Sequence, residues 1–183
     1  MQTDPESEFV RRAQAGDRAA FAALVDRYWN PVRAWLAGLT GGEHAAEDLT
    51  QETFLKAWVG LPSLASCEAF RVWLFRIARN EFLALARSPR ADPRGVAPEP
   101  ADPRPGPEEL AQDGEASAAL RSALAGLAAP YREAYLLWTH ERLPYPEIAR
   151  VLDTTEDVAR WRVCEARRRL VRTLEPFLAP PNS

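Results

Sequence analysis

The sequence predicts an all-α protein made of two small helical domains joined by a flexible, proline-rich linker. Three observations support this prediction. Apolar residues recur every three or four positions over most of the chain, which is the spacing of helices with one buried face. Alternating runs of β-branched residues, which are typical of strands, do not occur in the sequence. Between residues 88 and 117 the helical pattern stops, and seven prolines and three glycines take its place.

The proline-rich segment divides the chain into an amino-terminal domain (1–87), a linker (88–117) and a carboxy-terminal domain (118–178). The linker contains almost no large apolar residue, so it cannot bury enough surface to offset the entropy that it would lose on ordering. Its three basic residues are outnumbered by seven acidic ones. The linker is therefore expected to be extended and acidic.

Composition narrows the function. The chain has 183 residues, of which 46% are apolar and 27% charged, as in ordinary globular proteins. The net charge of -3 means that any binding of nucleic acid must depend on local basic surfaces. No apolar run is long enough for a membrane span and the acidic start lacks the core of a signal peptide, so a cytoplasmic protein is expected.

Few residues of the sequence are of the types that bind metals or catalyse reactions. The two cysteines and two histidines lack the spacing of metal ligands, so neither a metal site nor a cofactor is expected. No HExxH sequence, phosphate-binding loop or nucleophile-base set is present, so no catalytic residue is assigned and an enzyme is not expected.

The amino-terminal domain is expected to hold four helices. A short helix near residues 8–15 precedes a longer amphipathic helix that passes through residues 21–28. Pro31 is expected to kink this helix or to start a new turn, because a proline inside a helix lacks an amide donor and clashes with the preceding turn. Gly41 and Gly42 then break the chain before the third helix.

The third helix, over residues 46–58, is the element on which the others are expected to depend. Its apolar groups point to more than one side, so it is expected to contact several neighbours in a bundle. Polar side chains three or four positions apart share one arc and form an acidic strip suited to docking on a basic protein surface. The alternative is an ordinary solvated face. The residues of this arc are Asp48, Gln51, Glu52 and Leu55.

The fourth helix, over residues 68–87, follows a loop at residues 60–68. One side is expected to form core through Phe70, Leu74 and Ile77. The other side mixes arginines with apolar groups, which suits phosphate neutralisation beside stacked bases. The alternative is a solvated face with partly buried arginine stems. This side carries Arg71, Val72, Phe75, Arg76, Arg79 and Arg87.

The carboxy-terminal domain is expected to end in a helix-turn-helix. A short helix over residues 143–152, a turn at Asp153 and Thr154, and a final helix have the required spacing. Thr154 and Asp157 fit a capping box at the start of the final helix. Six arginines between residues 160 and 172 make this helix basic, which favours DNA binding over a plain core pair. Its buried stripe is expected to be Ala159, Val163, Ala166 and Leu170.

Three stretches resemble bacterial RNA polymerase sigma factors of the extracytoplasmic-function (ECF) branch, and they stand in the family's order. The first is Ala46-Glu47-Asp48-Leu49-x-Gln51-Glu52-x-Phe54-Leu55. The second is Phe70-x-x-Trp73-Leu74-x-x-Ile77-Ala78-x-Asn80. The third is Tyr145-x-Glu147-Ile148-Ala149-x-x-Leu152 with Arg160-x-Arg162 and Ala166-Arg167-Arg168-Arg169-Leu170.

The resemblance implies a sigma factor that binds core RNA polymerase, directs it to promoter DNA and helps to melt it. The domains then correspond to sigma region two, a helical bundle, and sigma region four, a helix-turn-helix. In the family, region two grips the clamp of the largest polymerase subunit and region four meets the flap of the second-largest. An anti-sigma factor is a further candidate partner, and a membrane is not.

The resemblance also assigns residues. Core-polymerase binding falls to Asp48, Gln51, Glu52 and Leu55. The loop at residues 60–68 and the helix after it are implied to hold a flipped base of the minus-ten element, with Arg71, Trp73, Arg76, Arg79 and Asn80 as DNA-binding residues. The minus-35 residues are Arg160, Trp161, Arg162, Arg167 and Arg168.

Two other functions remain open at the level of sequence. A free-standing helix-turn-helix regulator would bind duplex DNA without polymerase, but it would not need the acidic strip on residues 46–58. A sigma-like protein could bind polymerase yet read no promoter. Val158 and Trp161, which depart from the family's usual recognition helix, keep this second alternative open, and Asp153 replaces the usual glycine of the turn.

Overall fold

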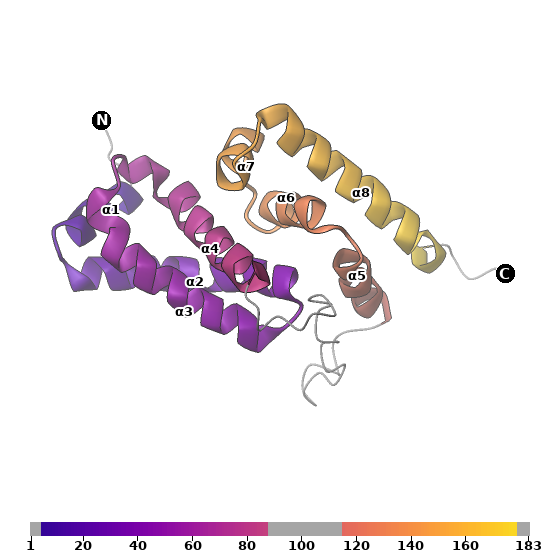
Figure 1. Cartoon of the computed structure of the whole chain (residues 1–183), viewed down its shortest axis with the longest axis horizontal. Coiled ribbons are helices and arrows are strands. Elements are labelled where there is room, and N and C mark those ends of the chain that lie inside the picture. Colours follow the sequence, from indigo (N-terminus) through magenta and orange to yellow (C-terminus); the bar gives the residue numbers. More distant parts are fainter. Residues whose placement is uncertain (1–4, 88–114, 179–183) are drawn as a thin grey trace.

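The computed structural model describes residues 5–87 and 115–178, and within these ranges every regular element is a helix (Figure 1). The all-α prediction is confirmed, as are the two helical groups. Most of the predicted linker, residues 88–114, lies outside the described residues.

The first group holds four helices, α1 (Pro5–Gln14), α2 (Arg18–Thr40), α3 (Glu43–Gly60) and α4 (Phe70–Arg87). Two short 3-10 turns, Leu61–Ser63 and Cys67–Ala69, join α3 to α4. These bounds agree with the four expected helices. Pro31 lies inside α2, which continues through it, so the proline does not end the helix.

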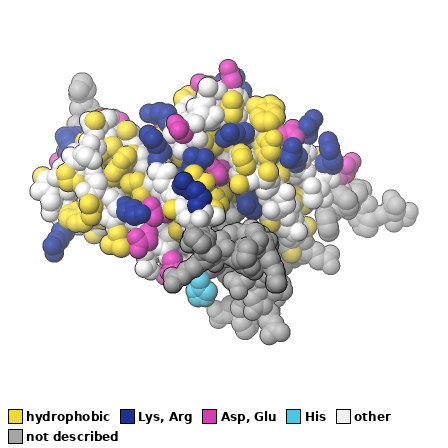
Figure 2. All heavy atoms as spheres, viewed as in Figure 1, with side chains coloured by type: hydrophobic (Ala, Val, Ile, Leu, Met, Phe, Trp, Pro, Cys, Tyr) yellow, Lys and Arg dark blue, Asp and Glu magenta, His cyan; other side chains and the backbone are white. Residues whose placement is uncertain are grey.

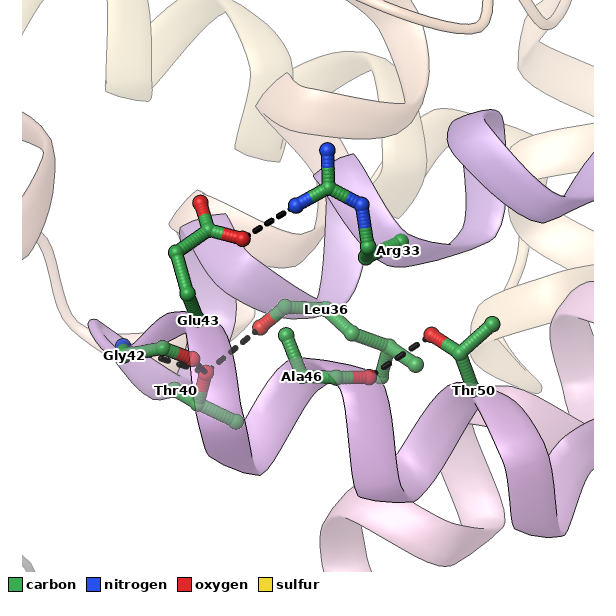
Figure 3. Close-up of polar contacts among 7 residues, drawn as sticks. All are labelled: Arg33, Leu36, Thr40, Gly42, Glu43, Ala46 and Thr50. Atoms are coloured by element: carbon green, nitrogen blue, oxygen red, sulfur yellow. Dashed lines mark hydrogen bonds and ion pairs between the residues drawn. The ribbon is translucent and has the colours of Figure 1, made fainter. Parts of the chain in front are cut away.

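The sharp turn between α2 and α3 depends on Gly41 and on Thr40, of which Figure 3 shows Thr40 with its hydrogen bonds. Gly41 has φ 74°, in the left-handed region where glycine has no side chain to clash. The Thr40 hydroxyl lies 3.0 Å from the carbonyl oxygens of both Leu36 and Gly42. The turn is thus held by its own polar groups.

Polar contacts also fix α3 against α2 (Figure 3). Arg33 of α2 pairs with Glu43, which stands in the first turn of α3 where a carboxylate complements the helix dipole. Thr50 is fully buried, and its hydroxyl donates to the Ala46 carbonyl at 2.7 Å, so no polar group is left unpaired there. The Arg33–Glu43 pair therefore links α3 to α2, whereas the Thr50 hydrogen bond lies within α3.

The second group holds α5 (Glu115–Ala125), α6 (Ala129–Thr139), α7 (Tyr145–Leu152) and α8 (Glu156–Leu178). The turn between α7 and α8 places Asp153 at φ 51° and ψ 57°, so this aspartate adopts the left-handed conformation that a glycine usually supplies. The prediction that Thr154 caps the start of the final helix is wrong by one residue. Because α8 begins at Glu156, Thr155 precedes it, and its hydroxyl accepts from the Val158 amide at 3.3 Å.

The two groups pack against each other and share one apolar core, in which α7 lies on α4 and α6 lies on α2 (Figure 1). The fully buried side chains of this junction include Trp35, Phe75, Leu136 and Ile148. The rings of Trp35 and Phe75 meet edge to face at 5.5 Å, a favourable aromatic geometry. The sequence did not predict this junction.

We expect Gly38→Leu to separate the two groups without unfolding either. A Cβ at Gly38 would lie 2.6 Å from Cδ1 of Leu136, so a larger side chain must push α6 away from α2. Small-angle scattering should then give a larger radius of gyration at unchanged helix content. The control is Ala34→Leu, at an exposed position of the same helix. An unchanged radius for Gly38→Leu would contradict this account of the junction.

Candidate functional site

The acidic strip of α3 is exposed along its whole length. Asp48, Gln51, Glu52 and Leu55 all face solvent, and the Leu55 side chain is 61% exposed. Val59, one turn further on, is 80% exposed. Two exposed aliphatic side chains in line with two carboxylates form a surface typical of protein docking. Sequence analysis missed Val59, although its spacing of four from Leu55 was visible.

Lys56 flanks this strip and is the only lysine of the chain. Its ammonium group lies 2.6 Å from a carboxylate oxygen of Glu81 on α4, and the side chain stays 54% exposed. Because Glu81 takes up this positive charge, the strip keeps its acidic character.

Two of the five residues predicted to bind the minus-ten element lie in the junction between the helical groups. Arg79 donates from Nε to a carboxylate oxygen of Glu133 at 2.7 Å, and the Glu133 side chain is only 4% exposed. Arg71 reaches the backbone carbonyl of Glu141 and lies 3.5 Å from its carboxylate. In this arrangement both arginines are occupied by glutamates of the second group.

The covering of these arginines has a simple cause. Val72 and Phe75, expected on the mixed arginine side of α4, are 6% and 0% exposed. Helix α7 packs on α4 beside Val72, and the Phe75 ring meets Trp35 of α2, so α4 has two buried faces instead of one. The apolar groups between the arginines therefore form core.

Two of the three remaining predicted minus-ten residues, Trp73 and Arg76, lie at a hollow beside the loop that joins α3 to α4, and Asn80 does not line it. Trp73 and Arg76 line it together with loop residues 64–66, and the end of α7 forms the opposite wall. Arg76 and Asn80 are exposed, whereas Trp73 is half-buried. An aromatic ring beside an arginine suits a base next to a phosphate.

Helix α8 presents its basic surface away from the first helical group, because α6 and α7 lie between them (Figure 1). The predicted buried stripe is confirmed, with Ala159, Val163, Ala166 and Leu170 all buried. In Figure 2, Lys and Arg side chains stand along the part of the surface where α8 lies, with acidic side chains beside them. The exposed predicted residues are Arg160, Trp161, Arg167 and Arg168.

Aromatic rings of α6 and α7 contact three arginines of α8, two of them predicted minus-35 residues. Arg160 lies over Tyr145 at 5.3 Å, Arg167 over Trp138 at 5.2 Å and Arg169 over Tyr131 at 4.4 Å. Such contacts order a cation while leaving it available to a ligand. Sequence analysis missed these partners because they lie on other helices, whose approach to α8 depends on the fold.

A carboxylate also organises this surface. Glu165 pairs with Arg168 and Arg169, each at 2.7 Å. Hydrogen bonds from Arg168 and Arg169 hold the pKa of Glu165 below its ordinary value, so the group is ionised at neutral pH. The two arginines are thereby fixed one beside the other on the outer face of α8.

Arg160 and Arg162 lie on different sides of α8. They are two positions apart, which is about 200° around a helix, and Arg160 is exposed whereas Arg162 is half-buried. Trp161 leans on α6, with its ring 5.6 Å from that of Tyr131, and is 56% exposed. The predicted minus-35 residues therefore do not all share one surface.

Within the described ranges no helix is long and apolar enough to cross a membrane. The same residues contain no group of three or more side chains that could ligate a metal ion.

A helix-turn-helix with a basic final helix places the chain among DNA-binding proteins, and family models define the class further. Residues 24–91 match sigma-70 region 2, and residues 117–170 match sigma-70 region 4. The chain belongs to the sigma-70 family and is an RNA polymerase sigma factor of the ECF branch, a class of DNA-binding transcription initiation factors.

Relatives of full length support this assignment. The RNA polymerase sigma factor NccH of Alcaligenes xylosoxydans xylosoxydans is 30% identical over 94% of this chain and 97% of its own length. The RNA polymerase sigma-H factor of Pseudomonas aeruginosa is 29% identical, with 96% of each chain covered. The sigma-factor function predicted from sequence is confirmed over that of a free-standing regulator.

Solved structures agree. The sigma factor RpoE from Bartonella quintana, solved in complex with the anti-sigma factor NepR, has a TM-score of 0.72 at 29% identity, with 85% of this chain and 96% of that chain covered. CnrH in complex with the cytosolic domain of CnrY has a TM-score of 0.71 at 28% identity, covering 94% of this chain and 99% of the other.

We expect Glu133→Ala to open the junction between the helical groups. It leaves Arg79 buried without its partner, which costs about 3 kcal/mol in a closed core, so the groups should part and let water reach the guanidinium. The sedimentation coefficient should fall. The double variant Arg79→Ala with Glu133→Ala removes both charges and should sediment closer to the wild type. A wild-type coefficient for Glu133→Ala alone would show that the pair does not hold the junction.

We expect Arg160→Ala and Arg162→Ala to differ at the upstream DNA. If Arg160 reads a base edge, its loss should cost about 1–3 kcal/mol and relax preference at one position. Arg162 lies on the other side of α8, so its loss should leave that preference intact. Selection of random DNA by the full chain bound to core polymerase would measure both. Equal effects, or no enriched sequence for the wild type, would contradict base reading by Arg160.

Proposed function

We propose that the acidic strip of α3 docks on the clamp of the largest polymerase subunit through Asp48, Gln51, Glu52 and Leu55. The observation that carries this proposal is the exposure of the whole strip while the opposite side of α3 is core. Carboxylates beside Leu55 and Val59 offer both charge and apolar area to a partner. The second helical group is proposed to meet the flap of the second-largest subunit.

The proposed minus-ten surface comprises the loop at residues 60–68 and α4, with Arg71, Trp73, Arg76, Arg79 and Asn80. The hollow beside this loop would receive an unstacked base, with Trp73 as stacking platform and Arg76 near the phosphate. The proposed minus-35 residues stand on two sides of α8 and are Arg160, Trp161, Arg162, Arg167 and Arg168. The domain ends are proposed at residues 87 and 118.

Engagement of the minus-ten surface then requires the two helical groups to part. Glu133 and Glu141 place carboxylates on Arg79 and Arg71, where phosphates of DNA would otherwise bind. The Arg71 contact is the less favourable of the two. Its Nε is buried without a hydrogen-bond partner, and burial raises the pKa of Glu141, although Arg71 opposes that shift.

Cellular context follows from the same proposal. The chain would work in the cytoplasm, where it meets polymerase and DNA, and it would contribute no reaction of its own. An anti-sigma factor is a candidate regulator, since the similar RpoE was solved with one.

Run-off transcription tests the proposal as a whole. Core polymerase with genomic DNA should yield discrete transcripts only when the chain is added. Binding to core polymerase without any transcript would instead support the sigma-like alternative that reads no promoter.

We expect Asp48→Lys or Glu52→Lys to weaken binding to core polymerase. Each reversal opposes a proposed basic partner, so the loss should be about 2 kcal/mol or more if the pair is desolvated. The matched control is Glu47→Lys, an exposed glutamate of the same helix that points about 100° away from Asp48. Titration of core polymerase with labelled chain gives all three affinities. Equal losses for Glu47 and the strip would indicate a general charge effect and not a docking face.

A further inference from the structure

The loop between α3 and α4 has few regular hydrogen bonds of its own. It consists of two single 3-10 turns, in which the Leu64 amide donates to the Leu61 carbonyl at 3.0 Å, whereas the Leu64 carbonyl takes its hydrogen bond from outside the loop. Its residues 64–66 form one wall of the hollow that also contains Trp73 and Arg76. The shape of this wall therefore depends on whatever holds the loop from behind.

Gln14, at the end of α1, holds it. Its amide nitrogen donates to the carbonyls of Leu61 at 3.1 Å and Leu64 at 2.8 Å. The Cys67 thiol lies 3.6 Å from the amide oxygen. Because carbonyl oxygens only accept hydrogen bonds, the amide nitrogen of Gln14 must face Leu61 and Leu64, and its amide oxygen faces the Cys67 thiol. One side chain thus binds the start, the middle and the end of the loop.

The support behind Gln14 is itself fixed. Val10 and Ala13 bury α1 in the core, and the Tyr28 hydroxyl donates to Glu6 at 2.7 Å. Arg12, two residues before Gln14, pairs at 2.6 Å with Asp17, which follows Gln14 and caps α2. The amide therefore stands on a rigid base about fifty residues away from the loop in the sequence.

We propose that Gln14 is a positioning residue for base capture, which shapes the wall of the hollow by fixing the carbonyls of Leu61 and Leu64. The proposal rests on the minus-ten function proposed above for this loop. It extends the functional surface to α1, because Gln14 lies outside the residues 24–91 that match the region-two model. Gln14 does not itself contact DNA in this role.

The test uses holoenzyme assembled from core polymerase and the full chain. The probe is a single-stranded oligonucleotide that carries the minus-ten segment of a promoter mapped by run-off transcription, together with a series in which one position at a time is abasic. The affinity for the native probe is divided by the affinity for the abasic probe that binds most weakly. This ratio reports capture of the base that is missing from that abasic probe. Because both affinities come from one preparation, partial unfolding lowers them equally and leaves the ratio unchanged.

Gln14→Met keeps the length of the side chain and removes its hydrogen bonds. Gln14→Glu keeps the size and an acceptor but loses the donor. We expect the native-to-abasic ratio to fall about tenfold in both variants, with binding to core polymerase unchanged. The control is Arg11→Met, one turn earlier on α1 at an exposed position, which should keep the wild-type ratio.

The possible outcomes distinguish a failure of the proposed base capture from a failure of the role proposed for Gln14. If the wild type binds native and abasic probes alike, the proposed base capture itself is wrong. If the wild type discriminates and both Gln14 variants discriminate equally well, Gln14 has no positioning role. If Arg11→Met loses discrimination as fully as Gln14→Met, the effect belongs to α1 in general, and this also overturns the inference.

Discussion

A single buried ion pair, between Arg79 and Glu133, governs how the two helical groups relate. Charges in a core are stabilised only when they are paired, so this contact favours one register of α4 against α6 and disfavours its neighbours. Trp35 adds a second polar link, since its indole nitrogen donates to the Glu133 carbonyl at 3.4 Å. Arg71 and Glu141 add a third polar contact. The rest of the junction is apolar, which makes it tight, yet the charges of Arg79 and Glu133 would be well solvated if it opened.

The helices themselves follow from the sequence because apolar periodicity and glycine breaks act locally. Asp153 at the turn and the buried stripe of α8 are of this kind. The sequence does not show which face of a helix packs against which neighbouring helix. Val72 and Phe75 stand among arginines in the sequence, yet both are core, because Val72 lies beside α7 and Phe75 packs on Trp35 of α2. The sequence did not point to a role for Gln14 either, because its partners are backbone carbonyls some fifty residues away.

The two proposed DNA surfaces are under different physical constraints. The arginines of α8 are held by aromatic rings and Glu165 within their own group and face outward whether or not the groups are joined. On the proposed minus-ten surface, Arg71 and Arg79 of α4 would have to leave Glu141 and Glu133 before they bind DNA. An upstream contact could therefore form first, at a surface that is already ordered, whereas contact at the melting site depends on a conformational change.

Lys56 gives the chain an unusual chemical property. It is the only lysine among 183 residues, it borders the acidic strip of α3, and its amine is half-exposed beside Glu81. Side-chain acetylation or amine-directed cross-linking has one lysine target in this protein, and that target lies at the edge of the proposed docking face. A bifunctional amine reagent would thus join this lysine only to groups that approach α3, so the cross-linked peptides that contain Lys56 would map the surface of a partner from a single known origin.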